Sequence, residues 1–185
     1  KEYDRLKISW LIHYADPLLT FDKVSLFYWQ HQVCEDLSFK VQTGDRVLLQ
    51  GRNGSGKSTI LKWIAGDGSV QYSGTFKRAP NLTVSYIPQS SEGLCRNLSD
   101  YAAENRLDES LLKAILRKLD FSREQFEKDI AAFSAGQKKK VLLAKSLCEK
   151  AHLYVWDEPL NYIDIISRAQ IEELILAFRP SLLFV

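Results

Sequence analysis

The stretch that decides the fold is Gly51-Arg52-Asn53-Gly54-Ser55-Gly56-Lys57-Ser58-Thr59, which fits the P-loop pattern GxxxxGK[ST] and follows the apolar run Val47-Leu48-Leu49. Its three glycines let successive N–H groups point at the phosphates of a nucleotide, and the helix that begins near Lys57 adds its positive dipole end. Lys57 supplies a mobile charge, Ser58 a hydroxyl for Mg²⁺, and Thr59 reinforces the loop. The order strand, loop, helix therefore predicts a nucleoside triphosphate site rather than a plain glycine-rich turn.

Composition limits the class of protein. With 185 residues the chain is long enough for one domain with its own core. No run reaches the roughly 18 apolar residues of a membrane helix, and the N-terminus has no signal-peptide pattern. The net charge of +2 is too small to indicate nucleic-acid binding by bulk electrostatics. Cys34, Cys95 and Cys148 are widely separated and have no CxxC spacing, so we expect no zinc site, no disulfide framework and a reducing cytoplasmic location.

Both ends of the chain suggest an excised piece. The sequence contains no Met, although omission of modified methionines would have the same effect, and Leu182-Leu183-Phe184-Val185 looks like a buried strand that is cut short. Residues 1–16 mix charged and aromatic side chains without a period and end at Asp16-Pro17. We therefore expect a linker tail over 1–16 and a single domain over 17–185.

Hydrophobic periodicity predicts alternating strands and helices. Strand-like runs cover 18–26, 33–41, 46–50, 72–77 and 82–87, and a helix is expected over 58–65. Residues 98–130 have helical spacing, with an apolar face that includes Leu112, Ile115 and Leu116. The remainder is expected as helix 134–150, strand 152–156, helix 164–178 and strand 181–185. This alternation predicts an α/β fold with a mainly parallel sheet and helices on both faces.

A second motif lies about a hundred residues after the P-loop. The apolar run His152–Trp156 ends in Asp157-Glu158-Pro159, which is the Walker B arrangement. Asp157 would hold Mg²⁺ through its water shell, and Glu158 would polarise the attacking water. Adjacent acidic residues can also mark nothing more than a helix start. The upstream P-loop favours the catalytic interpretation.

Between the two motifs, Phe133-Ser134-Ala135-Gly136-Gln137 places small residues at the start of a helix. Such a terminus binds anions, yet the P-loop already supplies one phosphate cradle, so a second nucleotide-facing surface is implied. At this point the chain resembles the ATP-binding-cassette (ABC) superfamily, whose signature is LSGGQ, with Phe133 in place of Leu and Ala135 in place of the first Gly. The resemblance extends over nearly all of residues 18–185.

The resemblance implies a P-loop NTPase (RecA-like) core, an N-terminal antiparallel β-subdomain and a small helical subdomain at about 90–132. It implies an ATPase that uses ATP and Mg²⁺ and needs a second cassette for full activity. The nucleotide-binding residues would be Tyr28, Gly51, Arg52, Asn53, Gly54, Ser55, Gly56, Lys57, Ser58 and Thr59. The catalytic residues would be Lys57, Gln89 and Glu158, and the metal ligands Ser58, Gln89 and Asp157.

Further motifs follow the order of the family. Tyr28 matches the aromatic residue that stacks on adenine, with Phe27 and Trp29 as alternatives and a core aromatic as the plain interpretation. Gln89 matches the Q-loop glutamine. Asp164 matches the D-loop aspartate, which touches a partner's nucleotide site, and it can also cap the following helix. The signature residues Ser134, Ala135, Gly136 and Gln137 would act on the partner's ATP, and the switch histidine of the family would fall after Val185.

The segment Pro159-Leu160-Asn161-Tyr162-Ile163-Asp164 differs from the transporter pattern Pro-Thr-Ser-Ala-Leu-Asp and resembles the ABC-F branch. FSAGQKKK and WDEPLNYIDIISR resemble the C-terminal cassette of ABC-F proteins that protect bacterial ribosomes from antibiotics. This implies a ribosome partner, a second cassette in the same full-length chain or in a homodimer, and no membrane insertion.

Other interpretations remain open. The main alternative is the ATP-binding subunit of an ABC membrane transporter. A chromosome-maintenance clamp is disfavoured, because the segment between Gln89 and Phe133 is short and lacks coiled-coil heptads. Lys138, Lys139 and Lys140 are interpreted as a solvated helix face rather than as RNA contacts.

Overall fold

The computed structural model describes residues 6–185, which form two compact units. The sheet unit consists of Trp10–Gln89, Ala151–Glu158 and Pro180–Val185. The helical unit consists of 6–9, Ser90–Lys150 and Pro159–Arg179. Residues 1–5 of the expected linker tail lie outside the described residues.

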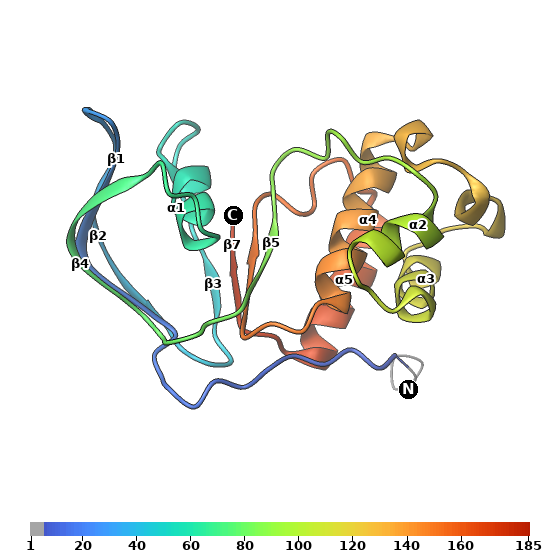
Figure 1. Ribbon diagram of the computed structural model, residues 1–185, viewed down its shortest axis with the longest axis horizontal. Helices are drawn as coiled ribbons and strands as arrows, with labels where there is room; N and C mark the ends of the chain where they lie inside the picture. The colour runs from blue at the N-terminus through green and yellow to red at the C-terminus, as the bar shows by residue number, and fades with distance from the viewer. Residues whose placement is uncertain (1–5) are drawn as a thin grey trace. The chain divides into compact units, whose positions relative to one another are not determined.

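A parallel sheet forms the centre of the sheet unit, with strand order β3 (Arg46–Leu48), β7 (Leu182–Phe184), β6 (Leu153–Trp156) and β5 (Val84–Ile87) (Figure 1). All four residues of β6 are buried, as expected of an apolar strand with a neighbour on each side. The register aligns Leu48, Phe184, Trp156 and Ile87. The carboxyl ends of these strands therefore lie at one edge of the sheet.

Helix α1 (Lys57–Ile64) follows β3 through the P-loop. It buries Ile60, Leu61 and Ile64 in a core that also contains Val155 and Leu183 of the parallel sheet. Burial of each such aliphatic side chain contributes roughly 1.5–3 kcal/mol. This packing fixes the helix, and with it the loop that precedes the helix.

An antiparallel sheet completes the sheet unit, with strand order β2 (His31–Val41), β1 (Leu19–Tyr28) and β4 (Gln71–Arg78). Phe21, Val24 and Leu26 of β1 are buried in the core, and register shifts on both sides of β1 let the sheet bend. This sheet and the parallel sheet agree with the α/β class and the antiparallel β-subdomain expected from the sequence.

The helical unit contains α2 (Leu98–Glu104), α3 (Glu109–Lys118), two short 3₁₀ helices (Arg123–Glu127 and Ile130–Ala132), α4 (Ala135–Cys148) and α5 (Ile165–Phe178). The stretch 98–130, with its helical spacing, is thus divided. N-caps at Asn97, Asp108, Ser122 and Asp129 begin each new segment. Leu112, Ile115 and Leu116 of α3 are buried, as predicted.

The prediction that the three successive lysines of α4 form a solvated helix face was wrong for two of them. Lys139 is 1% exposed and Lys140 is 8% exposed, so neither belongs to a solvated face. In the described part of the expected linker tail, Leu6, Ile8 and His13 are buried. Within residues 6–185, no helix combines the length and the apolar character needed to cross a membrane.

Candidate functional site

The P-loop leaves β3 at the carboxyl edge of the parallel sheet and ends at Gly56, the N-cap of α1. Gly54 and Gly56 have φ values of +81° and +87°, which L side chains rarely adopt. A Cβ at Gly56 would also overlap the carbonyl oxygen of Val33 on β2. Gly56 therefore allows the loop to pack directly on the antiparallel sheet.

Lys57 turns back over the loop that precedes it. Its Nζ donates a hydrogen bond to the carbonyl oxygen of Gly51 at 2.5 Å. The ammonium group is thus held at the loop, where a triphosphate would meet the free N–H groups of the helix terminus. Ser58 and Thr59 follow on the first turn of α1 and are partly buried.

The acidic pair follows β6 at the same edge. Asp157 is 0% exposed, and its N–H donates to the carbonyl oxygen of Ile87 on β5 at 3.0 Å. A carboxylate is a hard oxygen ligand of the kind that Mg²⁺ takes, so Asp157 is chemically suited to hold a divalent cation at this position. The hydroxyl of Ser58 and the amide oxygen of Gln89 are hard ligands of the same class. Among the described residues, no cluster of three or more His, Cys, Asp or Glu side chains that could hold a metal ion is found.

Gln89 and Glu158 meet although they lie 69 positions apart. Gln89 Nε2 donates a hydrogen bond to Glu158 Oε2 at 2.9 Å. Glu158 has φ +48°, a left-handed conformation that costs a non-glycine residue on the order of 1–3 kcal/mol. This conformation turns the chain sharply at the end of β6. The structure therefore brings together two of the three residues predicted to be catalytic.

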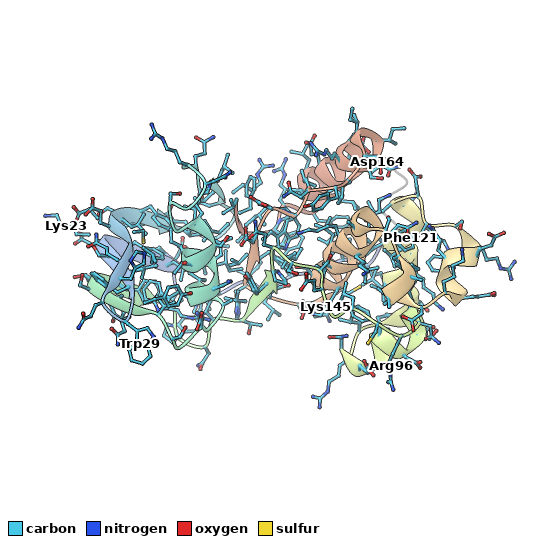
Figure 2. The ribbon with its side chains drawn as sticks, turned by 90° about the horizontal axis from the view of Figure 1, so that it is seen from above. Lys23, Trp29, Arg96, Phe121, Lys145 and Asp164 are labelled. Atoms are coloured by element: carbon cyan, nitrogen blue, oxygen red, sulfur yellow. The ribbon has the colours of Figure 1, made fainter. Side chains whose placement is uncertain are left out.

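Tyr28 and Trp29 lie at the end of the β1–β2 hairpin. The Tyr28 hydroxyl donates to Asp67 Oδ2 at 3.3 Å, and its ring packs against the core of the sheet unit. Trp29 is 89% exposed and extends from the turn (Figure 2). Adenine stacking by Tyr28 stays a prediction. Asp67 was missed by sequence reasoning, because the contact joins segments that only the fold brings together.

The signature motif begins α4 in the helical unit. Ser134 Oγ accepts from the N–H of Gln137 at 3.2 Å, and Gln137 Oε1 accepts from the N–H of Ser134 at 2.9 Å. This capping box uses two N–H groups and leaves those of Ala135 and Gly136 as first-turn donors outside the box. Phe133 is buried and packs edge-on against Phe121, which explains why an aromatic residue is accepted there.

The D-loop leads into α5, and Asp164 is the N-cap of that helix, as predicted. Its Oδ2 accepts from the N–H of Ser167 at 2.9 Å, and its Oδ1 lies 3.3 Å from Lys140 Nζ. The bonds from Ser167, reinforced by Lys140, lower the pKa of Asp164 to about 2. The ion pair between Lys140 and Asp164 was not predicted from the sequence. The one sequence feature that could have pointed to it is the basic residue four positions after Gly136.

The family model described as "ABC transporter" matches residues 34–161, more than half of the chain. The chain is 28% identical over 177 residues to the probable ATP-binding protein YheS of Escherichia coli K12, with 92% of this chain covered. The chain spans only 27% of the length of YheS.

Two further similarities have larger mutual coverage. The manganese transport system ATP-binding protein MntB of Halalkalibacterium halodurans is 28% identical over 185 residues, which covers 89% of this chain and 73% of MntB. The solved structure of a putative ABC transporter ATP-binding protein from Pyrococcus furiosus has a TM-score of 0.74 to this chain at 21% sequence identity. The match covers 90% of this chain and 89% of the Pyrococcus furiosus chain. The second similarity supports the fold alone.

Replacement of Gly56 by Ala should destabilise the protein by at least about 1–2 kcal/mol, since a left-handed residue acquires a Cβ. The overlap with Val33 O should also displace the loop and weaken ATP binding by roughly 10-fold or more. Urea unfolding and ATP titration measure both effects. Gly68→Ala is the matched control, because a Cβ at Gly68 meets nothing within 4 Å. Equal behaviour of the two variants would contradict the role of Gly56.

The lowered pKa of Asp164 predicts a pH dependence of stability. A carboxyl group whose pKa is lower in the folded state stabilises the fold above its unfolded pKa of about 3.9 and loses that contribution as pH falls toward 2. Because the side chain is half exposed, the effect should be modest. Unfolding measured between pH 2 and pH 5 should show a shallower pH slope for Asp164→Asn than for wild type. An unchanged slope would show that Asp164 is not shifted.

Proposed function

Because the chain belongs to the ABC transporter family, we propose that it is an ATP-binding and ATP-hydrolysing cassette of a protein with two cassettes. One observation carries the proposal. The P-loop, Asp157 and the hydrogen-bonded pair Gln89 and Glu158 all follow the carboxyl ends of strands in one parallel sheet. Ligands of open α/β sheets bind at that edge.

The proposed roles follow from the chemistry of each group. The N–H groups of the loop and the ammonium of Lys57 bind the β- and γ-phosphates. Ser58, Asp157 and Gln89 would hold Mg²⁺, which would supply positive charge to the phosphates. Glu158 polarises the attacking water, and Gln89 orients the Glu158 carboxylate through the 2.9 Å hydrogen bond. Tyr28 stacks on adenine in this proposal, with Trp29 as the exposed alternative.

A second cassette is the proposed partner, either in the same full-length chain or as a second copy. Ser134, Ala135, Gly136 and Gln137 would bind the γ-phosphate held by the P-loop of the partner. Large apolar side chains beside Asp164 support such an interface, since Tyr162 is 74% exposed and Ile165 is 83% exposed. Closure would then depend on γ-phosphate contacts from both cassettes.

For the whole protein we propose that it is a cytoplasmic member of the ABC-F branch. In this proposal it acts on the ribosome and gives antibiotic resistance by ribosome protection. The motif 159–164, with Asn161, and the lysine-rich sequence after the signature support this branch. A membrane-transporter subunit is the second candidate, favoured by the 73% coverage of MntB, which is named for manganese transport. The two candidates share the cassette and differ in the partner that ATP-driven closure acts on.

Replacement of Glu158 by Gln should lower ATP turnover on the order of 100-fold or more, because the amide cannot polarise water, while ATP affinity stays within about 2-fold. Phosphate release and nucleotide titration measure the two effects, with the exposed Glu172→Gln as control.

Specific activity should rise with protein concentration if two cassettes are needed. Brisk turnover that is independent of concentration would contradict the shared site.

The partner can be identified with the full-length protein carrying Glu158→Gln, which should stay closed in ATP. On a sucrose gradient we expect it to sediment with ribosomes when ATP is present and to leave that fraction without ATP. Lys57→Ala, which lacks the phosphate-binding ammonium, should not sediment with ribosomes under either condition. Recovery of the Glu158→Gln protein with membrane vesicles instead would favour the transporter.

A further inference from the structure

The signature helix α4 and the D-loop, residues 161–164, touch each other at two places within the helical unit. Lys140 Nζ lies 3.3 Å from Asp164 Oδ1. Gly136 lies so close to the carbonyl oxygen of Tyr162 that a Cβ at position 136 would overlap it. Gly136 and Lys140 are four residues apart and therefore lie on one face of α4. The D-loop thus packs along that face.

The ion pair at this contact is not an ordinary surface pair. Lys140 is 8% exposed, and a buried ammonium is unfavourable unless a counter-charge lies within reach. Asp164 supplies that charge with one oxygen, while its other oxygen accepts from the N–H of Ser167 and caps α5. The carboxylate is therefore fixed from two helices at once.

The D-loop backbone has a further contact of its own. Arg168 Nε donates to the carbonyl oxygen of Ile163 at 3.0 Å, and the Ile163 side chain is buried. Tyr162 has φ +65°, so the loop makes a tight bend between its two fixed points. Loss of the Lys140 contact would leave the loop bonded to α5 and packed against Gly136, but without the ion pair that fixes it to α4.

We infer that Lys140 is a positioning residue, which fixes the D-loop to the signature helix through Asp164 so that both elements face a second cassette as one rigid surface. The catalytic consequence rests on the proposed function of a shared ATP site. The fixation itself is a property of the helical unit and can be measured without nucleotide.

The first experiment measures hydrogen exchange of the amides in residues 159–164. Lys140→Met removes the charge and keeps much of the length, and Asp164→Asn removes the charge but keeps an oxygen that can cap α5. Both variants should exchange about 10-fold faster than wild type in this segment. Lys140→Arg should restore protection. Lys138→Met is the matched control on the same helix, where the lysine is half-buried, and should behave as wild type.

The second experiment measures ATP turnover of the same variants. Lys140→Met should lower kcat about 10-fold and change KM for ATP by less than about 2-fold, because the P-loop is untouched. Lys140→Arg should recover most of kcat, which a loss of general stability would not predict. The double variant Lys140→Met with Asp164→Asn should be no slower than either single variant, since both remove one interaction.

Several outcomes would overturn the inference. Unchanged exchange of 159–164 in Lys140→Met would show that Lys140 does not fix the D-loop, whatever its activity. Faster exchange with unchanged kcat would show that the fixation has no catalytic role. If Lys140→Met does not fold, Asp164→Asn and Lys140→Arg decide the same questions. Failure of the wild-type protein to bind ATP would instead contradict the proposed function, and the exchange result would still stand.

Discussion

The alignment of four parallel strands is the constraint on which the rest of the structure depends. Central β6 pairs with β5 on one side and with β7 on the other, and its register sets Ile87, Trp156 and Phe184 level with one another. A shift of one residue would turn the buried side chains of β6 to the opposite face. The same shift would move Asp157 away from the edge where the P-loop and Gln89 emerge.

Gln89 and Glu158 also mark the places where the chain leaves the sheet unit. Each is the last residue of its segment in that unit, before Ser90 and Pro159 begin segments of the helical unit. Their hydrogen bond therefore ties together two of the chain's exits from the sheet. The positive φ of Glu158 holds its side chain at this point, where it is only partly exposed. Backbone strain of this kind is retained where the surrounding structure fixes it.

The sequence was most informative where the chemistry is local. The P-loop, the Walker B carboxylates and the capping role of Asp164 all lie in short contiguous motifs, and the structure places them on the expected elements. The α/β class followed from alternating periodicity. The hydrogen bond between Gln89 and Glu158 was not predicted, because no local pattern relates residues 69 positions apart; family resemblance assigned each of them a catalytic role separately.

The remaining features depended on contacts that a linear pattern does not contain. Three successive lysines look solvated, since charged residues are seldom buried without partners. Lys140 is buried because the D-loop, more than twenty residues later, supplies Asp164. The helical spacing over 98–130 did not predict where one helix ends and the next begins. Asp108 and Ser122 are N-caps in the structure, but residues of these types also occur on helix surfaces.

In the proposed shared ATP site, the pairing of Lys140 limits how the signature motif would bind a phosphate. Its charge is neutralised by Asp164, so Lys140 is not available to an anion at the start of α4. The capping box uses the N–H groups of Ser134 and Gln137, and no acidic side chain occupies the first turn. Anion recognition at this terminus then depends on the N–H groups of Ala135 and Gly136 and on the helix dipole. Because these groups are fixed by the backbone, their direction depends on how α4 is held, and the D-loop contact is one of the restraints that holds it.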